Sequence, residues 1–172
     1  MPHHFSQQPA MLHLVCGKIA SGKSTLARKL ANAPLTVLLS EDRWLTALYA
    51  DKMTSVADYV YYSARLWEAI KPHLTDLLNA GVSVVLDFPA NTLAHREAIK
   101  DIILTSNCHH RLHFLNVPDA ICKARLLARN HSGEHDFQAT EAQYDLISRY
   151  FVTPQPDEGF SIIYYDASGE KL

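Results

Sequence analysis

Short apolar runs alternate along this chain with longer segments in which apolar residues recur every three or four positions. Such runs are typical of buried strands, and the recurring pattern is typical of helices. Strands are predicted over residues 12–16, 36–40, 83–87, 111–117 and 161–165. Helices are predicted over residues 23–32, 56–79, 92–106, 119–130 and 140–151, and a short helix or a turn over residues 41–50. Because strands that alternate with helices form parallel sheets covered on both faces, the predicted fold class is α/β.

The longest of these helical segments contains a proline, Pro72. Proline lacks the N–H donor of a helix interior, so Pro72 is predicted to kink or divide that helix. The chain has 172 residues, without a repeat or an interdomain linker, and this length suits one domain. Residues 1–10 are polar and are predicted to form a flexible extension, and residues 11–172 to form a single domain.

Composition narrows the classes of protein to consider. Apolar residues make up 48% of the chain, yet no apolar run approaches the roughly 18 residues that span a bilayer. The polar N-terminus lacks the pattern of a signal peptide, so a cytoplasmic location without membrane contact is expected. Three scattered cysteines do not suggest a disulfide framework. The net charge of −2 argues against a long nucleic acid as the main partner, and no obligate protein partner is indicated.

A glycine-rich segment, Gly-Lys-Ile-Ala-Ser-Gly-Lys-Ser over residues 17–24, joins the first predicted strand to the first predicted helix. It matches the pattern GxxxxGK[ST] of the phosphate-binding P-loop. Gly17 and Gly22 permit backbone conformations and close approaches that a Cβ would block. Backbone N–H groups of the loop, including those of Ala20 and Ser21, then surround a phosphate at the positive end of the helix. The segment predicts a site for the phosphates of ATP.

Three side chains at the end of this loop have predicted contacts with the nucleotide. Lys23 reaches the β- and γ-phosphates, Ser24 offers its hydroxyl to Mg²⁺, and Thr25 is placed to touch the α-phosphate. ATP and Mg²⁺ are therefore the predicted cofactors. The ten histidines form no convincing set of metal ligands, and structural or surface roles are predicted for them.

The second predicted strand ends in Ser40-Glu41-Asp42-Arg43. In α/β sheets of this kind, ligands bind beyond the carboxyl ends of the strands. Asp42 is therefore expected to face the γ-phosphate, where it can take a proton from an attacking hydroxyl. Arg43 could hold an anionic group of the substrate or neutralise the transferring phosphoryl group. The alternative for Asp42 is that it caps the helix that begins there.

A second carboxylate, Asp87, ends the third predicted strand after a largely apolar run. This is the position of a Walker-B-type residue, which holds Mg²⁺ through water or orients the acceptor. The alternative is an ordinary solvated residue at the end of a strand.

Arg125 and Arg129 are four residues apart on one predicted helix, so both project to the same side. A polar stretch over residues 130–135 follows them. Arginines on a mobile segment could close over ATP, stabilise developing charge and exclude water. A lid is therefore predicted around residues 125–139, with two commonplace exposed arginines as the alternative.

Taken together, these motifs resemble those of a group of P-loop kinases that includes zeta toxins, chloramphenicol phosphotransferases and phage-type polynucleotide 5′-kinases. The resemblance covers residues 12–165. It rests on the P-loop, the pair Asp42-Arg43, Asp87 followed by Asn91 and Arg96, Arg125-x-x-x-Arg129-Asn130, and the late Pro154 and Glu158.

The resemblance implies a three-layer P-loop NTPase fold of the nucleoside-kinase type, with a five-stranded parallel sheet in the order 2-3-1-4-5 and a helical lid. It also implies roles for individual residues. Asp42 is the expected general base, Arg125 and Arg129 the expected phosphate contacts, and Arg96 an expected substrate contact.

The acceptor of the phosphoryl group is less clearly encoded. The segment from Trp44 to Trp67, which follows Asp42, contains six aromatic residues, counting both tryptophans. They either line a site for a planar substrate or pack a helix onto the sheet. The leading prediction is a kinase that acts on a hydroxyl of a small molecule or a nucleoside-like acceptor. The alternatives are a 5′-hydroxyl polynucleotide or RNA kinase, and an ATP-binding or ATP-hydrolysing regulatory protein without a dedicated acceptor.

Overall fold

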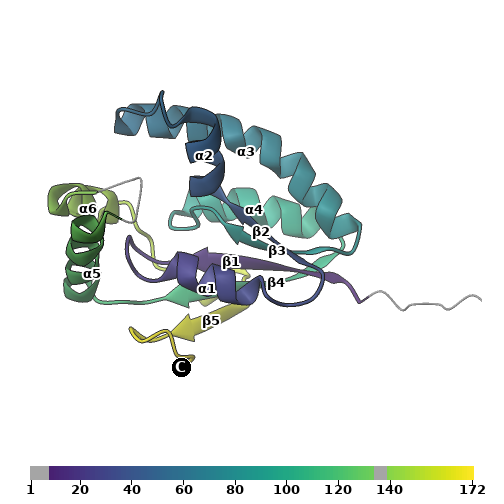
Figure 1. Ribbon diagram of the computed structural model, residues 1–172. Coiled ribbons are helices and arrows are strands. Elements are labelled where there is room, and N and C mark those ends of the chain that lie inside the picture. The colour runs from purple at the N-terminus through teal and green to yellow at the C-terminus, as the bar shows by residue number, and fades with distance from the viewer. Residues whose placement is uncertain (1–7, 134–138) are drawn as a thin grey trace, which may run out of the picture.

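Five parallel strands form the centre of the molecule (Figure 1). The computed structural model describes residues 8–133 and 139–172. The elements in chain order are β1 (Ala10–Cys16), α1 (Lys23–Leu30), β2 (Thr36–Ser40), α2 (Glu41–Tyr49), α3 (Val56–Asn79), β3 (Ser83–Asp87), α4 (Leu93–Thr105), β4 (Cys108–Leu115), α5 (Asp119–Ser132), α6 (Glu141–Ser148), a 3-10 turn (Pro156–Glu158) and β5 (Ile162–Tyr165).

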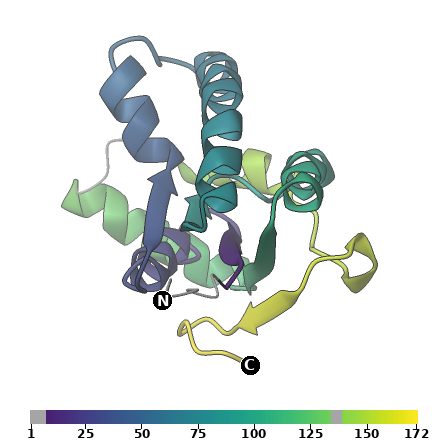
Figure 2. The same cartoon turned by 90° about the vertical axis from the view of Figure 1, so that its right-hand side faces the viewer.

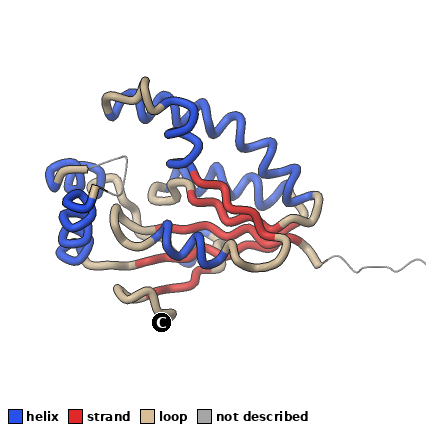
Figure 3. The backbone as a smooth tube through the Cα atoms, in the orientation of Figure 1, coloured by secondary structure: helices blue, strands red, loops and turns tan. Residues whose placement is uncertain are grey.

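The sheet has the strand order β2-β3-β1-β4-β5, and every neighbouring pair is parallel, which confirms the predicted fold (Figure 3). In the register, Ser40 lies opposite Asp87, and Leu14 lies opposite Leu86. Parallel strands present their carboxyl ends at one edge, so the residues after β1, β2 and β3 meet there.

Helices cover both faces of this sheet, with α3 and α4 on one side and α1 on the other (Figures 1 and 2). The inner stripe of α3 repeats every four residues, at Leu66, Ile70, Leu74 and Leu78, and each is at most 3% exposed. These side chains pack against apolar residues of β1 and β3. Burial of each such side chain contributes about 1.5–3 kcal/mol, so this layer supplies much of the stability of the domain.

The prediction that Pro72 divides the long helix is wrong. The helix α3 is continuous over 24 residues with Pro72 inside it (Figure 1). Pro72 and its neighbours Lys71 and His73 are exposed, and so is Glu68, whose carbonyl loses its helical donor. That carbonyl is on the solvent side of the helix, where water can replace the missing donor, while the buried stripe keeps the two halves aligned on the sheet.

Side-chain caps define where four of the helices begin. Ser40, Ser55, Thr92 and Thr140 each accept a hydrogen bond from the backbone N–H three residues further along. Each such cap contributes about 1 kcal/mol. Thr92 and Thr140, predicted as the first helical residues, are thus the caps of α4 and α6.

The ends of the sheet differ slightly from the predicted strands. The strand β4 begins at Cys108 rather than at residue 111, because Cys108 pairs with Ala10 of β1. The strand β1 likewise includes Ala10, the last residue of the predicted extension, and residues 1–7 lie outside the described residues. Within the described ranges, no helix combines the length and apolar character needed to cross a membrane.

A chain of polar rings runs through the sheet from β1 to β5. His13 Nδ1 lies 2.9 Å from His113 Nε2, and His113 Nδ1 lies 2.7 Å from the hydroxyl of Tyr165. His113 is 2% exposed. Burial, helped by the positive charges of His13, Lys171 and Arg111, lowers the pKa of His113 to about 4. His113 therefore has a structural role of the kind predicted for the histidines. Its neutral ring, on β4, links His13 of β1 to Tyr165 of β5.

This arrangement predicts that the protein loses stability in mild acid. A histidine in the unfolded chain titrates near 6.5, so protons bind the unfolded state more tightly than the folded state. Above about pH 6.5, the neutral His113 costs the folded state nothing. As the pH falls from about 6.5 towards 4, the free energy of unfolding decreases by at most about 3 kcal/mol, because the unfolded chain gains a proton at this histidine and the folded protein does not. Urea unfolding at pH 7.5 and pH 5 measures the loss.

The variant His113→Gln is expected to reduce the difference in unfolding free energy between these two pH values. His109→Gln, at an exposed position on the same strand, is the matched control and is expected to keep the wild-type difference. An unchanged pH dependence in His113→Gln would contradict the assignment.

Candidate active site

The P-loop forms the turn between β1 and α1. It lies at the edge of the sheet where the strands end (Figure 1). At Gly17 a Cβ would come within 2.4 Å of Ser21 Oγ and 3.0 Å of the Leu115 carbonyl, so only glycine fits. Gly22 has a φ of +101°, a left-handed conformation that glycine adopts without strain. Gly22 also precedes the first turn of α1, which contains no acidic residue and has no side-chain cap. The free N–H groups of that turn point out of the helix end, as an anion site requires.

The ammonium group of Lys23 lies at the mouth of this loop. Its Nζ donates to the carbonyl of Gly17 at 2.5 Å and to the carbonyl of Lys18 at 2.9 Å. Burial lowers the pKa of Lys23, and the negative charges of Asp87 and Asp42 raise it. Lys23 is thus held in a poorly solvated position by backbone oxygens, with carboxylates nearby that favour its charged form.

Two oxygen ligands of the kind that Mg²⁺ prefers lie side by side next to the loop. The hydroxyl of Ser24 donates to Asp87 Oδ2 at 3.2 Å, which joins the first turn of α1 to the end of β3. Burial raises the pKa of Asp87, whereas the hydrogen bond from Ser24 and the charge of Lys23 lower it. This donor pair fits a magnesium ion next to the phosphates. Thr25 follows on the exposed side of α1.

Asp42 and Arg43 project from the first turn of α2, and both are exposed. The cap of this helix is Ser40, whose Oγ accepts from the Arg43 N–H at 3.4 Å. The alternative in which Asp42 is the cap is therefore wrong, and its carboxylate is not occupied by capping.

The charge of Asp42 affects several of the predicted site residues. Its charge raises the pKa of Lys23 from α1 and the pKa of Asp87 from β3. Burial lowers the pKa of Arg129 on α5, and the charge of Asp42 raises it. The charge of Asp42 on α2 therefore acts on side chains of three other elements, and the register of Ser40 opposite Asp87 puts the start of α2 next to the end of β3.

The two arginines of α5 take different positions. The guanidinium of Arg125 donates to the carbonyl of Ser21 in the P-loop at 3.4 Å and also to the carbonyl of Ala167. Arg129, one turn further, is half-buried on the same side, and its Nε has no partner among the described residues. The helix continues to Ser132, two residues beyond the predicted end, and residues 134–138 of the predicted lid lie outside the described residues.

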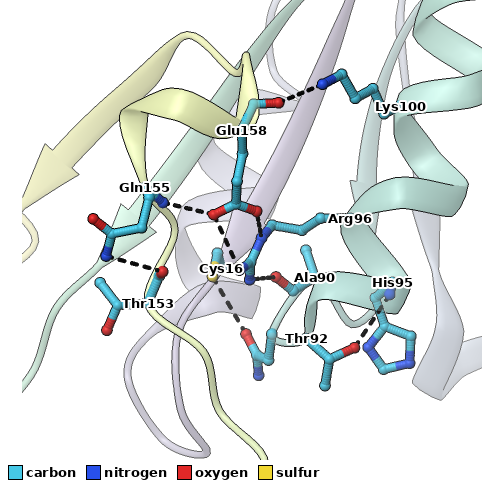
Figure 4. A network of polar contacts seen from close by, with 10 residues as sticks. Cys16, Ala90, Thr92, His95, Arg96, Lys100, Thr153, Gln155 and Glu158 are labelled. Carbon is cyan, nitrogen blue, oxygen red and sulfur yellow. Dashed lines mark hydrogen bonds and ion pairs between the residues drawn. The ribbon is translucent and has the colours of Figure 1, made fainter.

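Arg96, predicted to contact the substrate, lies elsewhere. Its side chain is fully buried, and Nε donates to Glu158 Oε1 at 2.7 Å while Nη1 donates to the Ala90 carbonyl at 2.9 Å (Figure 4). A second bond, from Nη2 to Glu158 Oε2, measures 3.3 Å. The guanidinium is therefore engaged by protein groups and has no exposed face to offer to a substrate. The prediction is corrected accordingly: Arg96 joins α4 to the segment before β5.

Most of the aromatic segment packs inside the protein. The rings of Tyr49 and Tyr62 stack at 4.4 Å, and Trp67 packs against Phe88 at 5.8 Å between centroids. Trp44 and Tyr61 differ, since 41% and 57% of their surfaces are exposed. Packing is thus the main role of this segment, and the two exposed rings are those that can still meet a ligand.

One carboxylate of the site was missed by the sequence analysis. Glu41 is only 6% exposed, although it adjoins Asp42, and its Oε1 accepts from the hydroxyl of Tyr59 on α3 at 2.5 Å. Burial raises the pKa of Glu41 to about 7, which the hydrogen bond from Tyr59 opposes and the charges of Asp42 and Asp87 reinforce. The position of Glu41 directly before Asp42 was visible in the sequence, but its burial was not.

The strand order and the glycine-rich loop between β1 and α1 define the class of the molecule, a P-loop domain. The profile of the AAA domain family matches residues 12–154, so the chain belongs to that family. No curated protein sequence matches the chain significantly.

Solved structures with similar folds come from several kinases. A candidate kinase from Chloroflexus aurantiacus has 21% identity and a TM-score of 0.73, over 94% of this chain and 87% of that one. A sugar kinase from Janibacter has 17% identity and a TM-score of 0.66, over 94% and 88%. The APS kinase of Mycobacterium tuberculosis, solved with AMPPNP and APS, has 21% identity and a TM-score of 0.61, over 92% and 88%. At these sequence identities, the comparison shows that the folds are alike and nothing beyond the fold.

Proposed function

We propose that this protein is an ATP-dependent phosphotransferase, which moves the γ-phosphoryl group of Mg-ATP to a hydroxyl of a small molecule or nucleoside-like acceptor. The observation that carries the proposal is the position of Asp42. An exposed carboxylate, free of capping, lies two residues after Ser40, which is opposite Asp87 in the sheet, and its charge acts on Lys23, Asp87 and Arg129. A protein that only binds nucleotide requires the loop but has no need of that carboxylate.

In the proposed reaction, Asp42 accepts the proton of the acceptor hydroxyl as its oxygen attacks the γ-phosphorus. An oxygen–phosphorus bond forms to the acceptor, and the bond from the γ-phosphorus to the bridging oxygen breaks, so that ADP leaves. Lys23 holds the β- and γ-phosphates, and the loop N–H groups bind the negative charge that remains on ADP. Arg125 and Arg129 approach from α5 and neutralise charge on the transferring group.

Magnesium would be held by Ser24 and Asp87, and when bound it neutralises charge on the phosphate oxygens. The protein groups keep that donor pair in place, because Asp87 ends a central strand and Ser24 belongs to the first turn of a helix packed on the sheet. The exposed Arg43, one residue beyond Asp42, is suited to bind an anionic part of the acceptor.

The net charge and the exposed aromatic rings support this acceptor class. The net charge of −2 does not suit a long polyanion, whereas the exposed rings of Trp44 and Tyr61 suit a planar group of modest size. A small hydroxyl-bearing molecule with a flat part, such as a nucleoside, fits both observations.

Transfer of label from γ-labelled ATP into a fractionated extract of metabolites and RNA tests this proposal. The variant Lys23→Ala is expected to lower transfer at least about 100-fold, because it removes a charge that stabilises the transferring group. Lys29→Ala, on the exposed last turn of the same helix, is the matched control and is expected to retain activity.

Each result of the assay separates the alternatives. Label in a small-molecule fraction supports the proposal. Label on the 5′ ends of RNA would replace it with a polynucleotide kinase, and release of phosphate without any labelled product would replace it with an ATP-hydrolysing protein that lacks an acceptor.

A further inference from the structure

The side chain of Asn91 forms a two-point contact with the first glycine of the P-loop. Its Oδ1 accepts from the Gly17 N–H at 3.0 Å, and its Nδ2 donates to the Gly17 carbonyl at 2.8 Å. A backbone N–H can only donate and a backbone carbonyl can only accept, so these partners determine the orientation of the amide group. Asn91 thus matches both polar groups of one residue that lies 74 positions away in the sequence.

The loop that carries Asn91 is itself held by buried contacts. The carbonyl of Asn91 accepts from the Val152 N–H at 2.8 Å. The preceding carbonyl, that of Ala90, accepts from Arg96, which is paired with Glu158 (Figure 4). Lys100 completes this network by donating to the Glu158 carbonyl at 2.6 Å. Contacts with α4 and with the segment before β5 therefore hold the loop in which the Asn91 amide faces the P-loop.

The Gly17 carbonyl accepts hydrogen bonds both from Asn91 and from Lys23, the proposed catalytic lysine. The Gly17 oxygen accepts from Asn91 Nδ2 at 2.8 Å and from Lys23 Nζ at 2.5 Å. The Gly17 carbonyl, together with the Lys18 carbonyl that accepts from the same Nζ at 2.9 Å, therefore helps to set where the ammonium lies. A rotation of that group would move both the ammonium and the adjoining N–H groups of the loop.

We propose that Asn91 is a positioning residue for phosphoryl transfer, which orients Gly17 and, through its carbonyl, the Lys23 ammonium that faces the ATP phosphates. The inference deepens the proposed phosphotransferase function and rests on its nucleotide site. Asn91 itself does not touch the substrate in this arrangement, since both polar ends of its amide are engaged by Gly17.

The variant Asn91→Asp tests the inference, because it keeps the shape of the side chain and replaces the donor with an oxygen. An ionised carboxylate would place that oxygen against the Gly17 carbonyl, whereas a protonated carboxyl restores one donor and one acceptor. ATP affinity, measured by calorimetry, is expected to fall about 10- to 100-fold at pH 8. The ratio of variant to wild-type affinity is expected to recover as the pH is lowered to 5.5.

The groups that surround position 91 do not by themselves produce this recovery. Cys16 from β1 touches the Asn91 amide, and Arg96, Glu158 and Lys23 are the charged groups nearby. Burial raises the pKa of Cys16 to about 12, so its thiol stays neutral throughout the range, and Arg96 and Glu158 remain paired. Any change in the charge of Lys23 affects wild type as well and is removed by taking the ratio.

Two further variants complete the experiment. Asn79→Asp is the matched control, because the side-chain oxygen of Asn79 accepts from the Asn107 N–H at 3.0 Å and a carboxylate can accept in the same way. The ATP affinity of this variant is expected to equal that of wild type. Asn91→Ala introduces no charge, serves if the Asp variant does not fold, and is expected to lose affinity equally at every pH.

The outcomes separate this inference from the proposed function. Wild type that does not bind ATP contradicts the proposed function. Wild type that binds ATP, together with Asn91→Asp or Asn91→Ala of unchanged affinity, contradicts only the positioning role.

Discussion

Substitution of Asp42 by Asn is expected to lower the rate of phosphoryl transfer about 100- to 10,000-fold while leaving the affinity for ATP largely unchanged. The amide has nearly the same shape as the carboxylate but cannot accept the proton of the attacking hydroxyl. Stability is expected to change by no more than about 0.5 kcal/mol, because Asp42 is exposed and Ser40 caps the helix. The turnover rate with the identified acceptor and the ATP dissociation constant check both parts.

Asp51→Asn is the matched control, since Asp51 is exposed in the turn that follows α2 and is distant in sequence from the strand ends. Full transfer by Asp42→Asn would refute its role as the base. If Glu41→Gln then abolished transfer, the buried carboxyl with a pKa near 7 would be the base instead.

Substitution of Arg96 by Met is expected to lower the free energy of unfolding by about 3–5 kcal/mol. Methionine fills much of the space, but it leaves the Glu158 carboxylate, whose side chain is 16% exposed, without its partner. The Ala90 carbonyl loses its donor as well. A buried charge without a partner costs more than the intact pair contributes, which is why the single substitution has so large an effect. Urea unfolding at 25 °C measures it.

The double variant Arg96→Met with Glu158→Gln is expected to recover part of this loss, because the unpaired charge is removed. Arg149→Met, at an exposed position after α6, is the control and is expected to change stability by no more than about 0.5 kcal/mol. A loss below about 1 kcal/mol in the single variant would mean that the ion pair is not needed to hold this segment.

Much of the fold was predictable from short-range patterns. The predicted ranges of β2, α3 and β3 agree with the structure at both ends, because each is an uninterrupted pattern bounded by clear breakers or caps. At β4 the prediction began three residues late, since a polar pair, His109 and His110, hides the alternation. The start of that strand depends on pairing with β1, which no local pattern contains.

The continuity of α3 through Pro72 has the same kind of cause. A proline weakens a helix locally, but whether the helix divides depends on the packing of its two halves. Four buried residues on one side of α3 hold those halves against the same sheet, and Pro72 faces solvent. The local rule was sound, and tertiary packing outweighed it.

The candidate site residues also divide into those that a local pattern identifies and those whose position depends on tertiary packing. Asp42 and Asp87 were candidates because Asp87 ends one strand and Asp42 comes shortly after the end of another, and a parallel sheet brings such ends together at one edge. Arg96 was misplaced because a helical arginine is equally compatible with solvent, substrate or a buried partner. Its partner, Glu158, lies 62 residues further along the chain, and only the packing of the segment before β5 on α4 brings the two together.

The sequence by itself determined the phosphate-binding loop, because that site is built from eight consecutive residues, 17–24, whose backbone geometry follows from two glycines and a helix start. Only the tertiary structure decided what supports and surrounds the loop. The amide of Asn91 on Gly17 and the buried Glu41 beside Asp42 depend on which distant elements pack together. Burial and hydrogen-bond partnership are properties of that packing, so a linear pattern names the candidate residues without assigning their contacts.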